Sequence, residues 1–271
     1  ALVPLSPAQA APFQQVADPA QKARVLLARM TPAERIGQLF LVGFKGRDVT
    51  SKNVKILDLV NNYHIGGIIL RAANDNFTAP QGGPEETFRM ATELQNSRYA
   101  ASQKAIRNPV TGLTYTPQYV PLFIAAAQEG DLYPNDQLWN GLTPLPSAMS
   151  VGATWKPATA ERVGTVMGSE LKAIGINLLF GPSLDVLDTP HPENSEDQGT
   201  RSFGGDPYWV GEMGKAYIRG IHQGSGKQVA VIAKNFPGRG NADRSPEEEI
   251  PTVRTTPEHP KPTDLPPFPA G

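Results

Sequence analysis

The sequence predicts an α/β fold built around a parallel sheet, and three features predict it. Short apolar segments alternate along the chain with longer amphipathic or polar ones. The short segments are apolar at successive positions, as in strands that are buried on both faces. Turn-rich segments follow their C-terminal ends. Strand–helix units of this kind make right-handed crossovers, so the sheet is either doubly wound or part of a (β/α) barrel.

Two helix-start signals open the predicted domain. Asp18 suits the cap of a helix over 19–30, because a proline occupies the first helical position after it. Thr31 suits a second cap, again followed by proline. Glu34 lies three residues after Thr31, which is the spacing of a capping box. A second, short helix is therefore expected directly after the first.

The remaining elements follow as five strands with helices between them. The predicted strands are rich in Val, Ile, Leu, Phe and Ala and span 38–44, 64–70, 121–127, 176–180 and 228–233. The predicted helices span 53–62, 85–103, 157–174 and 208–223. An insertion at 107–119 is expected to form a small hairpin. Five strands are fewer than the eight that close a barrel, so an incomplete barrel would leave an open sheet edge.

Four long segments at the ends of the strands are the expected place of function. They span 71–84, 128–147, 182–203 and 235–251. All of them follow strand C-terminal ends, and barrel enzymes hold their catalytic residues at that rim.

Composition excludes several classes of function. A net charge of -1, from 25 basic and 26 acidic residues, argues against nucleic acid or an anionic membrane as an electrostatic partner. The absence of cysteine excludes disulfides, zinc–thiolate sites and a thiol nucleophile. The four histidines lack metal-ligand spacing and no nucleotide-binding glycine loop occurs, so neither a metal nor a cofactor is expected. No apolar run approaches the ~20 residues of a membrane span.

Both ends of the chain are expected to lie outside the domain at 19–254. Residues 1–18 suit a flexible leader, and the proline-rich residues 255–271 suit an extended tail on a surface of this protein or of a partner. The chain begins with Ala, which predicts a processed form or a fragment. A cut after a signal peptide predicts a secreted or envelope-associated protein, and a cytoplasmic protein is the alternative.

One motif carries a specific resemblance. Residues 234–240, KNFPGRG, come directly after the fifth predicted strand. They resemble the Lys-His-Phe-Pro-Gly-His-Gly motif of glycoside hydrolase family 3, in its β-N-acetylhexosaminidase branch. Five other stretches resemble segments of that family in the same order, and they span 30–40, 66–70, 121–130, 175–186 and 201–207.

The resemblance implies a TIM-barrel-type fold, here incomplete with about five β/α units. It also implies a retaining mechanism, in which a carboxylate nucleophile forms a glycosyl-enzyme intermediate and a second group protonates the leaving oxygen. In this branch the acid is a histidine in the loop after the fifth strand. The implied ligand is a glycan that contains N-acetylglucosamine.

The chain departs from the family at the positions that carry the chemistry. Ala127 stands where the family has an aspartate that binds sugar hydroxyls, and Asn235 and Arg239 replace both histidines of the motif. The histidine of the mobile loop is also missing, which leaves Asp243 and Glu247 as weak candidates for an acid. The family's nucleophile follows a seventh strand, for which these residues contain no counterpart.

The chain matches the family at positions that bind the sugar. Arg201 and Lys234 match the family's sugar-contacting cations, and Glu129 and Asp185 lie on the same rim. Each of these residues also has a structural interpretation. Arg201 could pair with Asp185 or Asp197. Lys234 could pair with Glu129 or Asp185.

Three functions fit these observations. The first is an inactive relative of the hexosaminidases that serves as a structural or carbohydrate-binding subunit of a larger assembly. The second is a retaining β-N-acetylglucosaminidase whose nucleophile comes from further polypeptide, and the third is a carbohydrate sensor. The first explains all the substitutions together and is our prediction. It requires a protein partner or a second copy, or the tail, to cover the open sheet edge.

Overall fold

The computed structural model describes residues 18–49, 55–77, 83–108, 111–132, 136–138, 140–187, 199–240 and 265–268. Their main feature is a five-stranded sheet in which all neighbouring strands are parallel. The strands are, in spatial order, β1 (Leu41–Gly43), β2 (Gly67–Ile69), β5 (Phe123–Ala127), β6 (Leu178–Ser183) and β7 (Ala230–Lys234).

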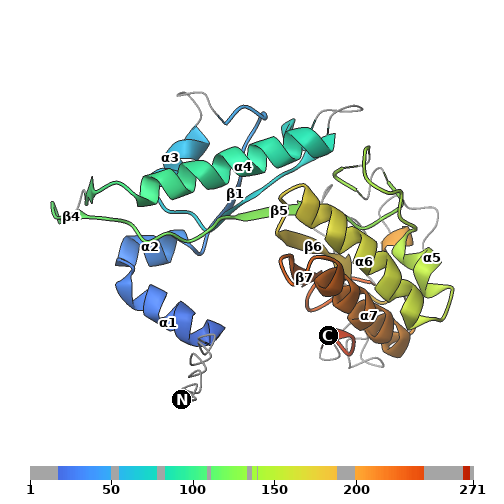
Figure 1. The fold of residues 1–271 in the computed structure, drawn as a ribbon. Coiled ribbons are helices and arrows are strands. Elements are labelled where there is room, and N and C mark those ends of the chain that lie inside the picture. Colours follow the sequence, from blue (N-terminus) through green and yellow to red (C-terminus); the bar gives the residue numbers. More distant parts are fainter. Residues whose placement is uncertain are drawn as a thin grey trace, which may run out of the picture.

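The order of the strands decides between the two predicted architectures. Spatial order equals chain order, so each crossover adds the next strand on the same side of the sheet (Figure 1). A doubly wound sheet would reverse its direction once, at a switch point. The sheet is therefore part of a (β/α) barrel. In the described residues β1 and β7 each pair on one side only, which agrees with the predicted incomplete barrel.

Helices follow the strands as the sequence predicts. The long ones are α4 (Gly83–Ser102), α6 (Pro157–Ala173) and α7 (Pro207–Gly224); the shorter ones are α1 (Pro19–Arg29), α2 (Pro32–Gly37), α3 (Lys55–Asn61) and α5 (Ala148–Gly152). Two single turns, η1 (Ala72–Asn74) and η2 (Gly199–Arg201), lie at the rim. Both predicted start signals are confirmed, because Asp18 caps α1 and Thr31 forms a capping box with Glu34. The predicted hairpin is β3 (Ile106–Arg107) paired with β4 (Thr114–Tyr115).

Several boundaries differ from the prediction by one to three residues, as at β2, which spans Gly67–Ile69 and not 64–70, and one helix was not predicted. The strand expected at 38–44 is only β1, because Gln38 ends α2 by donating its backbone N–H to Glu34 O at 3.1 Å. β6 continues past residue 180 to Ser183, where it still pairs with Lys234. α5 was not predicted; it begins at the cap Ser147 within the segment after β5.

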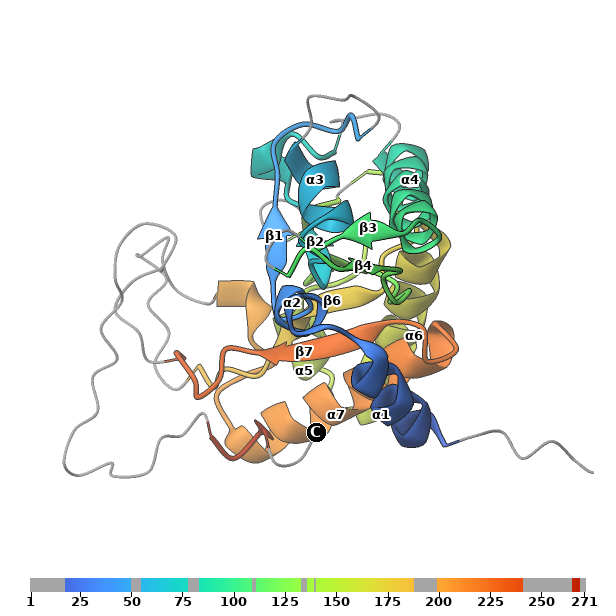
Figure 2. The same cartoon turned by 90° about the vertical axis from the view of Figure 1, so that its left-hand side faces the viewer.

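The two faces of the sheet differ in burial. Outward-facing side chains such as Ile124 and Leu179 are fully buried under the helices. Two inward-facing side chains are exposed: Phe123 of the central strand β5 is 45% exposed, and Ile232 of the edge strand β7 is 40% exposed. Figure 2 shows β1, β2 and β7 from this inner side. In a closed barrel these inner side chains would fill the interior.

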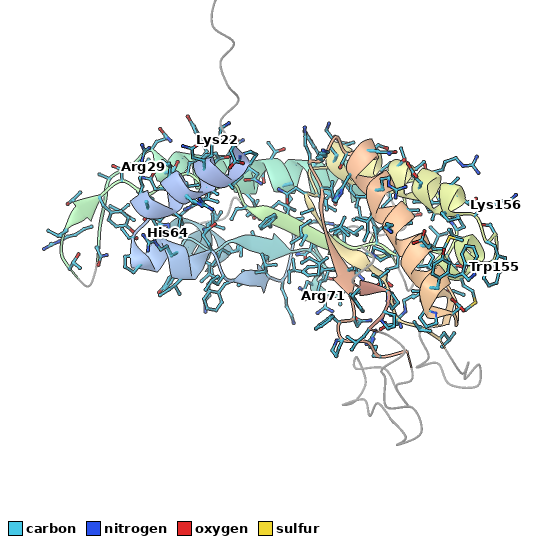
Figure 3. All side chains as sticks on the ribbon, turned by 90° about the horizontal axis from the view of Figure 1, so that it is seen from below. Lys22, Arg29, His64, Arg71, Trp155 and Lys156 are labelled. Carbon is cyan, nitrogen blue, oxygen red and sulfur yellow. The ribbon has the colours of Figure 1, made fainter. Side chains whose placement is uncertain are left out.

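A buried polar cluster lies at the end of the sheet opposite the rim, near His64 (Figure 3). Arg98 is fully buried and donates to the carbonyls of Gln118 at 3.1 Å and Val120 at 3.3 Å. Its Nη1 lies 3.0 Å from His64 Nδ1. A guanidinium only donates, so Nδ1 accepts and the proton of the neutral ring is on Nε2. That nitrogen lies 3.0 Å from the Tyr115 hydroxyl.

This cluster predicts a stability that depends on pH. Burial, and after it Arg98, lowers the pKa of His64 from its ordinary 6.5, while Glu34 acts in the opposite direction. The His64 ring therefore becomes protonated near pH 6.5 in the unfolded chain, and only at a lower pH in the folded chain. The stabilisation is complete above pH 6.5 and is lost as pH falls toward the folded pKa.

We expect this group alone to lower the free energy of unfolding by up to about 1.4 kcal/mol per pH unit in that window. Urea unfolding of the parent and of His64→Gln, measured between pH 7 and pH 5, tests this. The slope should be smaller in the variant. An equal slope in both proteins would contradict the assignment.

Candidate functional site

The carboxyl ends of the strands surround a cleft of about 480 Å³. Each strand of the sheet contributes one residue to its wall: Gly43, Ile69, Ala127, Phe180 and Lys234. The loops at the rim add Arg71, Asn74, Glu129, Gln137 and Arg201. Three of the predicted binding residues, Lys234, Glu129 and Arg201, thus line one cleft. Asp243 and Glu247 lie outside the described residues.

An ion pair joins the two charged residues that face each other in this cleft. Lys234 Nζ contacts Glu129 Oε1, which decides the pairing that the sequence left open. The Glu129 side chain is only 5% exposed and that of Lys234 is 23% exposed. Glu129 Oε2 is buried and has no hydrogen-bond partner among the described residues. A buried acceptor without a partner is costly, and this oxygen is closed to solvent, so a ligand hydroxyl would reach it only after the Glu129 side chain turned toward the cleft.

Asp185, which lies on the rim as expected, anchors the loop that follows β7. Its fully buried carboxylate accepts from Ser183 Oγ at 2.9 Å, Asn235 Nδ2 at 2.5 Å and the backbone N–H of Arg239 at 2.8 Å. Arg239 Nε lies 3.9 Å away as an ion-pair partner. Both residues that replace the motif histidines therefore contact Asp185.

Ala127 ends β5 at the wall of the cleft. Its methyl group has no polar atom, so this position accepts no hydrogen bond from a sugar hydroxyl. Arg201 reaches the same cleft from η2. The cleft thus combines three cations (Arg71, Arg201 and Lys234), one carboxylate with a buried oxygen that is unpaired among the described residues, and one apolar gap.

Asp136, which sequence reasoning missed, and Gln128, which was expected to satisfy loop N–H groups, hold the loop behind Glu129. The Asp136 carboxylate accepts the backbone N–H groups of Glu129 and Gly130, both at 2.8 Å. Burial raises the pKa of Asp136, although these backbone hydrogen bonds oppose the shift. The Gln128 amide donates to Leu138 O at 2.7 Å and accepts from Leu138 N at 2.9 Å. Polar residues are ordinary in such a turn-rich segment, so the sequence contains no signal for the contacts of Asp136.

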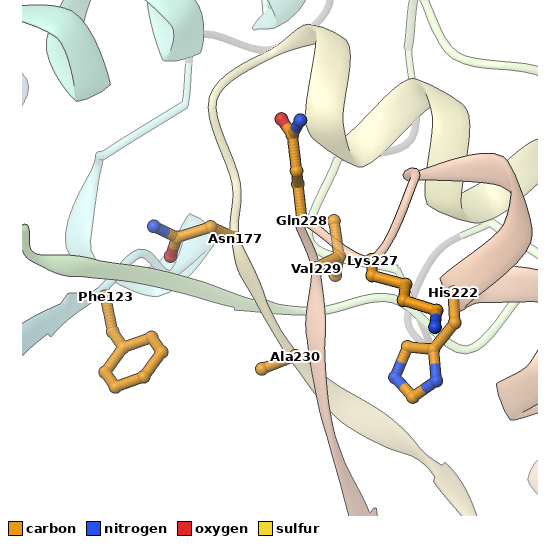
Figure 4. A pocket seen from close by; sticks show the side chains of 7 residues that line it. All are labelled: Phe123, Asn177, His222, Lys227, Gln228, Val229 and Ala230. Atoms are coloured by element: carbon orange, nitrogen blue, oxygen red, sulfur yellow. The ribbon is translucent and has the colours of Figure 1, made fainter. Parts of the chain in front are cut away.

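A second hollow, of about 560 Å³, lies at the amino ends of β5, β6 and β7 (Figure 4). His222 and Lys227, at the end of α7, belong to its lining. Asn177 also lines it, but both ends of its amide are engaged, with Ile124 N at 2.7 Å and Leu122 O at 2.9 Å. This hollow contains none of the predicted site residues.

Two further classes of site find no support in the described part of the chain. No group of three or more His, Asp or Glu side chains there is placed to hold a metal ion. None of the described helices combines the length and the apolar character needed to cross a membrane.

Comparison with known proteins gives a consistent set of relatives. Residues 31–271 match the glycosyl hydrolase family 3 N-terminal domain. The beta-N-acetylglucosaminidase/beta-glucosidase of Cellulomonas fimi is 32% identical over 237 residues, which are 87% of this chain and 34% of the relative. Beta-hexosaminidase A of Pseudoalteromonas piscicida is 28% identical over 76% of this chain and 30% of its own length.

Solved structures agree with these relatives. A family 3 beta-N-acetylglucosaminidase from Paenibacillus sp. str. FPU-7 superposes with a TM-score of 0.71 at 29% identity, covering 89% of this chain and 40% of that one. A beta-N-acetylhexosaminidase from Beutenbergia cavernae gives a TM-score of 0.67 at 25% identity, over 90% and 64%. This chain spans about a third of the length of the two sequence relatives named above.

Proposed function

The chain belongs to glycosyl hydrolase family 3, as a β-N-acetylglucosaminidase-like N-terminal domain, and from this premise we propose that it binds an N-acetylglucosamine-containing glycan without cleaving it by itself. One observation carries the proposal. The cleft contains the Lys234–Glu129 ion pair, which suits ligand binding, but Ala127 lies in its wall. Asn235 and Arg239, which replace the motif histidines, contact Asp185.

The binding half of the proposal rests on the polar atoms in the cleft. Lys234 Nζ donates to a sugar hydroxyl, and Glu129 Oε2 accepts from one once its side chain has turned toward the cleft. Arg201 lines the same space and is able to donate to a hydroxyl or an N-acetyl carbonyl. Hydrogen bonds that involve a charged group are stronger than those between neutral groups. A few such bonds therefore suffice to hold a small polar ligand.

The proposed lack of cleavage rests on the carboxyl groups found in the described part of the cleft. A retaining glycosidase needs two carboxyl groups about 5–5.5 Å apart across the scissile bond. Among the described residues that line the cleft, Glu129 is the one carboxylate, and Lys234 holds one of its oxygens. The Asn235 amide is no proton donor for a leaving group, and the Arg239 guanidinium keeps its protons.

Two measurements on the 271-residue chain test the proposal. With an aryl β-N-acetylglucosaminide we expect no turnover, and a turnover number of about 1 s⁻¹ or more would contradict it. Calorimetry with N-acetylglucosamine should give millimolar or weaker binding. Ala127→Asp should tighten it about tenfold to a hundredfold, since a charge-assisted hydrogen bond contributes about 1.5–3 kcal/mol.

Ala127→Asn is the matched control, because it adds an acceptor of the same shape without the charge. We expect a smaller gain from it than from Ala127→Asp. If neither variant changes the affinity, the sugar does not lie against Ala127 and the cleft is not its site.

A second candidate function is an active β-N-acetylglucosaminidase completed by further polypeptide. The Cellulomonas relative carries that activity in its name, and this chain covers only 34% of it. A larger polypeptide that contains this chain should then hydrolyse the aryl glycoside. A mechanism-based fluoro-sugar should label it covalently outside these 271 residues, which mass spectrometry of its peptides would show.

We further propose that polypeptide covers the exposed inner face of the sheet. Ile232 lies there on the edge strand β7 and Phe123 on the central strand β5. Light scattering of the 271-residue chain should then give a mass above 29.1 kDa, and Ile232→Glu should lower it. Leu27→Glu on α1 is the control, since that side chain is also exposed but lies away from the sheet. A stable 29.1 kDa monomer that melts sharply would contradict association.

A further inference from the structure

Three aromatic rings form a continuous surface outside the rim cleft. Trp155 follows α5, and Tyr208 and Trp209 lie in the first turn of α7. The Trp209 ring centroid is 5.2 Å from that of Trp155 and 5.5 Å from that of Tyr208, in edge-to-face contacts. Trp209 packs against the core, whereas Trp155 is 58% exposed and Tyr208 is 67% exposed. We refer to these three residues as the aromatic platform.

The backbone of Trp155 is unusual for so large a residue. Its φ of 53° is in the left-handed region, and its N–H donates to Gly152 O at 2.9 Å, at the end of α5. Glycine is the common residue in this conformation after a helix. A bulky side chain there opposes folding. The ring projects from the outside of the molecule, at the end away from His64 (Figure 3). A use for the ring other than stability accounts for its presence.

A hollow of about 390 Å³ adjoins the platform. Tyr208 lines it together with two carboxylates, Asp206 and Glu212, and with Pro266 of the C-terminal segment. Asp206 Oδ1 caps α7 by accepting from Trp209 N at 3.0 Å. Glu212 contacts Lys215 at 3.5 Å on the exposed side of α7. The hollow therefore has an aromatic wall and hydrogen-bond acceptors at its border.

We infer that the platform and this hollow form a second carbohydrate-binding site, for a β-linked oligosaccharide. Aromatic faces pack against the C–H groups of pyranose rings, and carboxylates accept from their hydroxyls. Aromatic rings are also enriched in protein–protein interfaces, but Asp and Glu are depleted there, so the two carboxylates favour a glycan over a protein partner. No catalytic role is part of this inference.

The topology places this site at the same end of the barrel as the cleft. α5 lies in the connection that leaves β5, and α7 begins after the loop that carries Arg201. A glycan held on the platform would thus remain near the rim while one of its sugars occupies the cleft. The choice of an N-acetylglucosamine oligomer as ligand rests on the proposed function, whereas the site itself rests on the rings and carboxylates.

Calorimetry with the β-1,4-linked tetrasaccharides of N-acetylglucosamine and of glucose tests the inference. Trp155→Gly and Tyr208→Ala should each weaken binding of at least one tetrasaccharide about two- to tenfold, as expected for loss of one aromatic contact. Trp155→Gly should keep or raise the melting temperature, since glycine suits this backbone. Tyr99→Ala, which removes an exposed ring on α4, is the control and should have no effect.

Lys234→Met, checked to be folded by its melting transition, separates this site from the cleft; if it does not fold, Lys234→Met/Glu129→Leu takes its place. If it abolishes monosaccharide binding while the platform variants still weaken tetrasaccharide binding, both sites are supported. If Lys234→Met has no effect but the platform variants do, the proposed function fails and the second site stands. Tetrasaccharide affinities that are unchanged in the Trp155→Gly/Tyr208→Ala double variant overturn the inference. A change in molecular mass without a change in affinity also overturns it, because the rings then serve a protein contact.

Discussion

Replacing Arg98 by methionine is expected to lower the free energy of unfolding by about 3–5 kcal/mol. The side chain is fully buried and donates to Gln118 O, Val120 O and His64 Nδ1. Methionine has a similar length but no donor, so all three acceptors lose their partner inside the protein. Each orphaned buried group costs about 1–3 kcal/mol. Urea denaturation with a common m-value measures the difference.

Arg89→Met is the matched control on the same helix. Arg89 is exposed and pairs with Glu93 at 3.1 Å, four residues along α4. Such a surface pair contributes about 0.3–0.5 kcal/mol, so this change should be small. Arg98→Lys should fall between the two, because an ammonium lacks the planar fork that reaches several acceptors. If Arg98→Met costs no more than Arg89→Met, the buried cluster does not stabilise the fold.

Much of the fold could be predicted because it depends on local signals. The cap at Asp18 and the capping box of Thr31 and Glu34 are short-range patterns, and both occur as expected. The limits of β1 were missed because Gln38 is held in two ways, by its backbone N–H on Glu34 O at the end of α2 and by its side chain on His64 O at 2.6 Å, and the second contact is tertiary. The burial of Arg98 was missed for a similar reason, since residues far along the chain supply its acceptors.

α5 shows the same limit at the rim. Five residues are too few for a helical pattern to be recognised. Gly152 ends this helix where a Cβ would lie 1.8 Å from Phe203 O. That close approach joins two segments about fifty residues apart, which no local pattern indicates.

The candidate site could be predicted only as a set of residues at one rim. Parallel strands bring their carboxyl ends together, so Lys234, Glu129 and Arg201 were expected near one another, and all three line the cleft. Which carboxylate contacts Lys234 depends on side-chain geometry across β6. The Asp185 carboxylate already accepts hydrogen bonds from Asn235 and Arg239. Lys234 therefore pairs with Glu129 and not with Asp185.

Lys234→Met is expected to destabilise the fold and to remove sugar binding from the cleft. It leaves Glu129, which is only 5% exposed, as a buried carboxylate without its cation. Breaking a buried pair from one side costs about 3–5 kcal/mol. Lys215→Met is the control, because Lys215 contacts Glu212 at 3.5 Å in a more exposed pair. Thermal denaturation and calorimetry with N-acetylglucosamine measure the two effects separately.

The double variant Lys234→Met/Glu129→Leu distinguishes a structural pair from a ligand-binding one. Two apolar side chains leave no buried charge, so the double variant should be more stable than Lys234→Met alone. Its sugar binding should remain lost, because both the ammonium donor and the free Glu129 Oε2 acceptor are gone. Recovery of stability together with parental sugar affinity would show that the pair serves the fold alone. The glycan would then have to be recognised by groups other than Lys234 and Glu129.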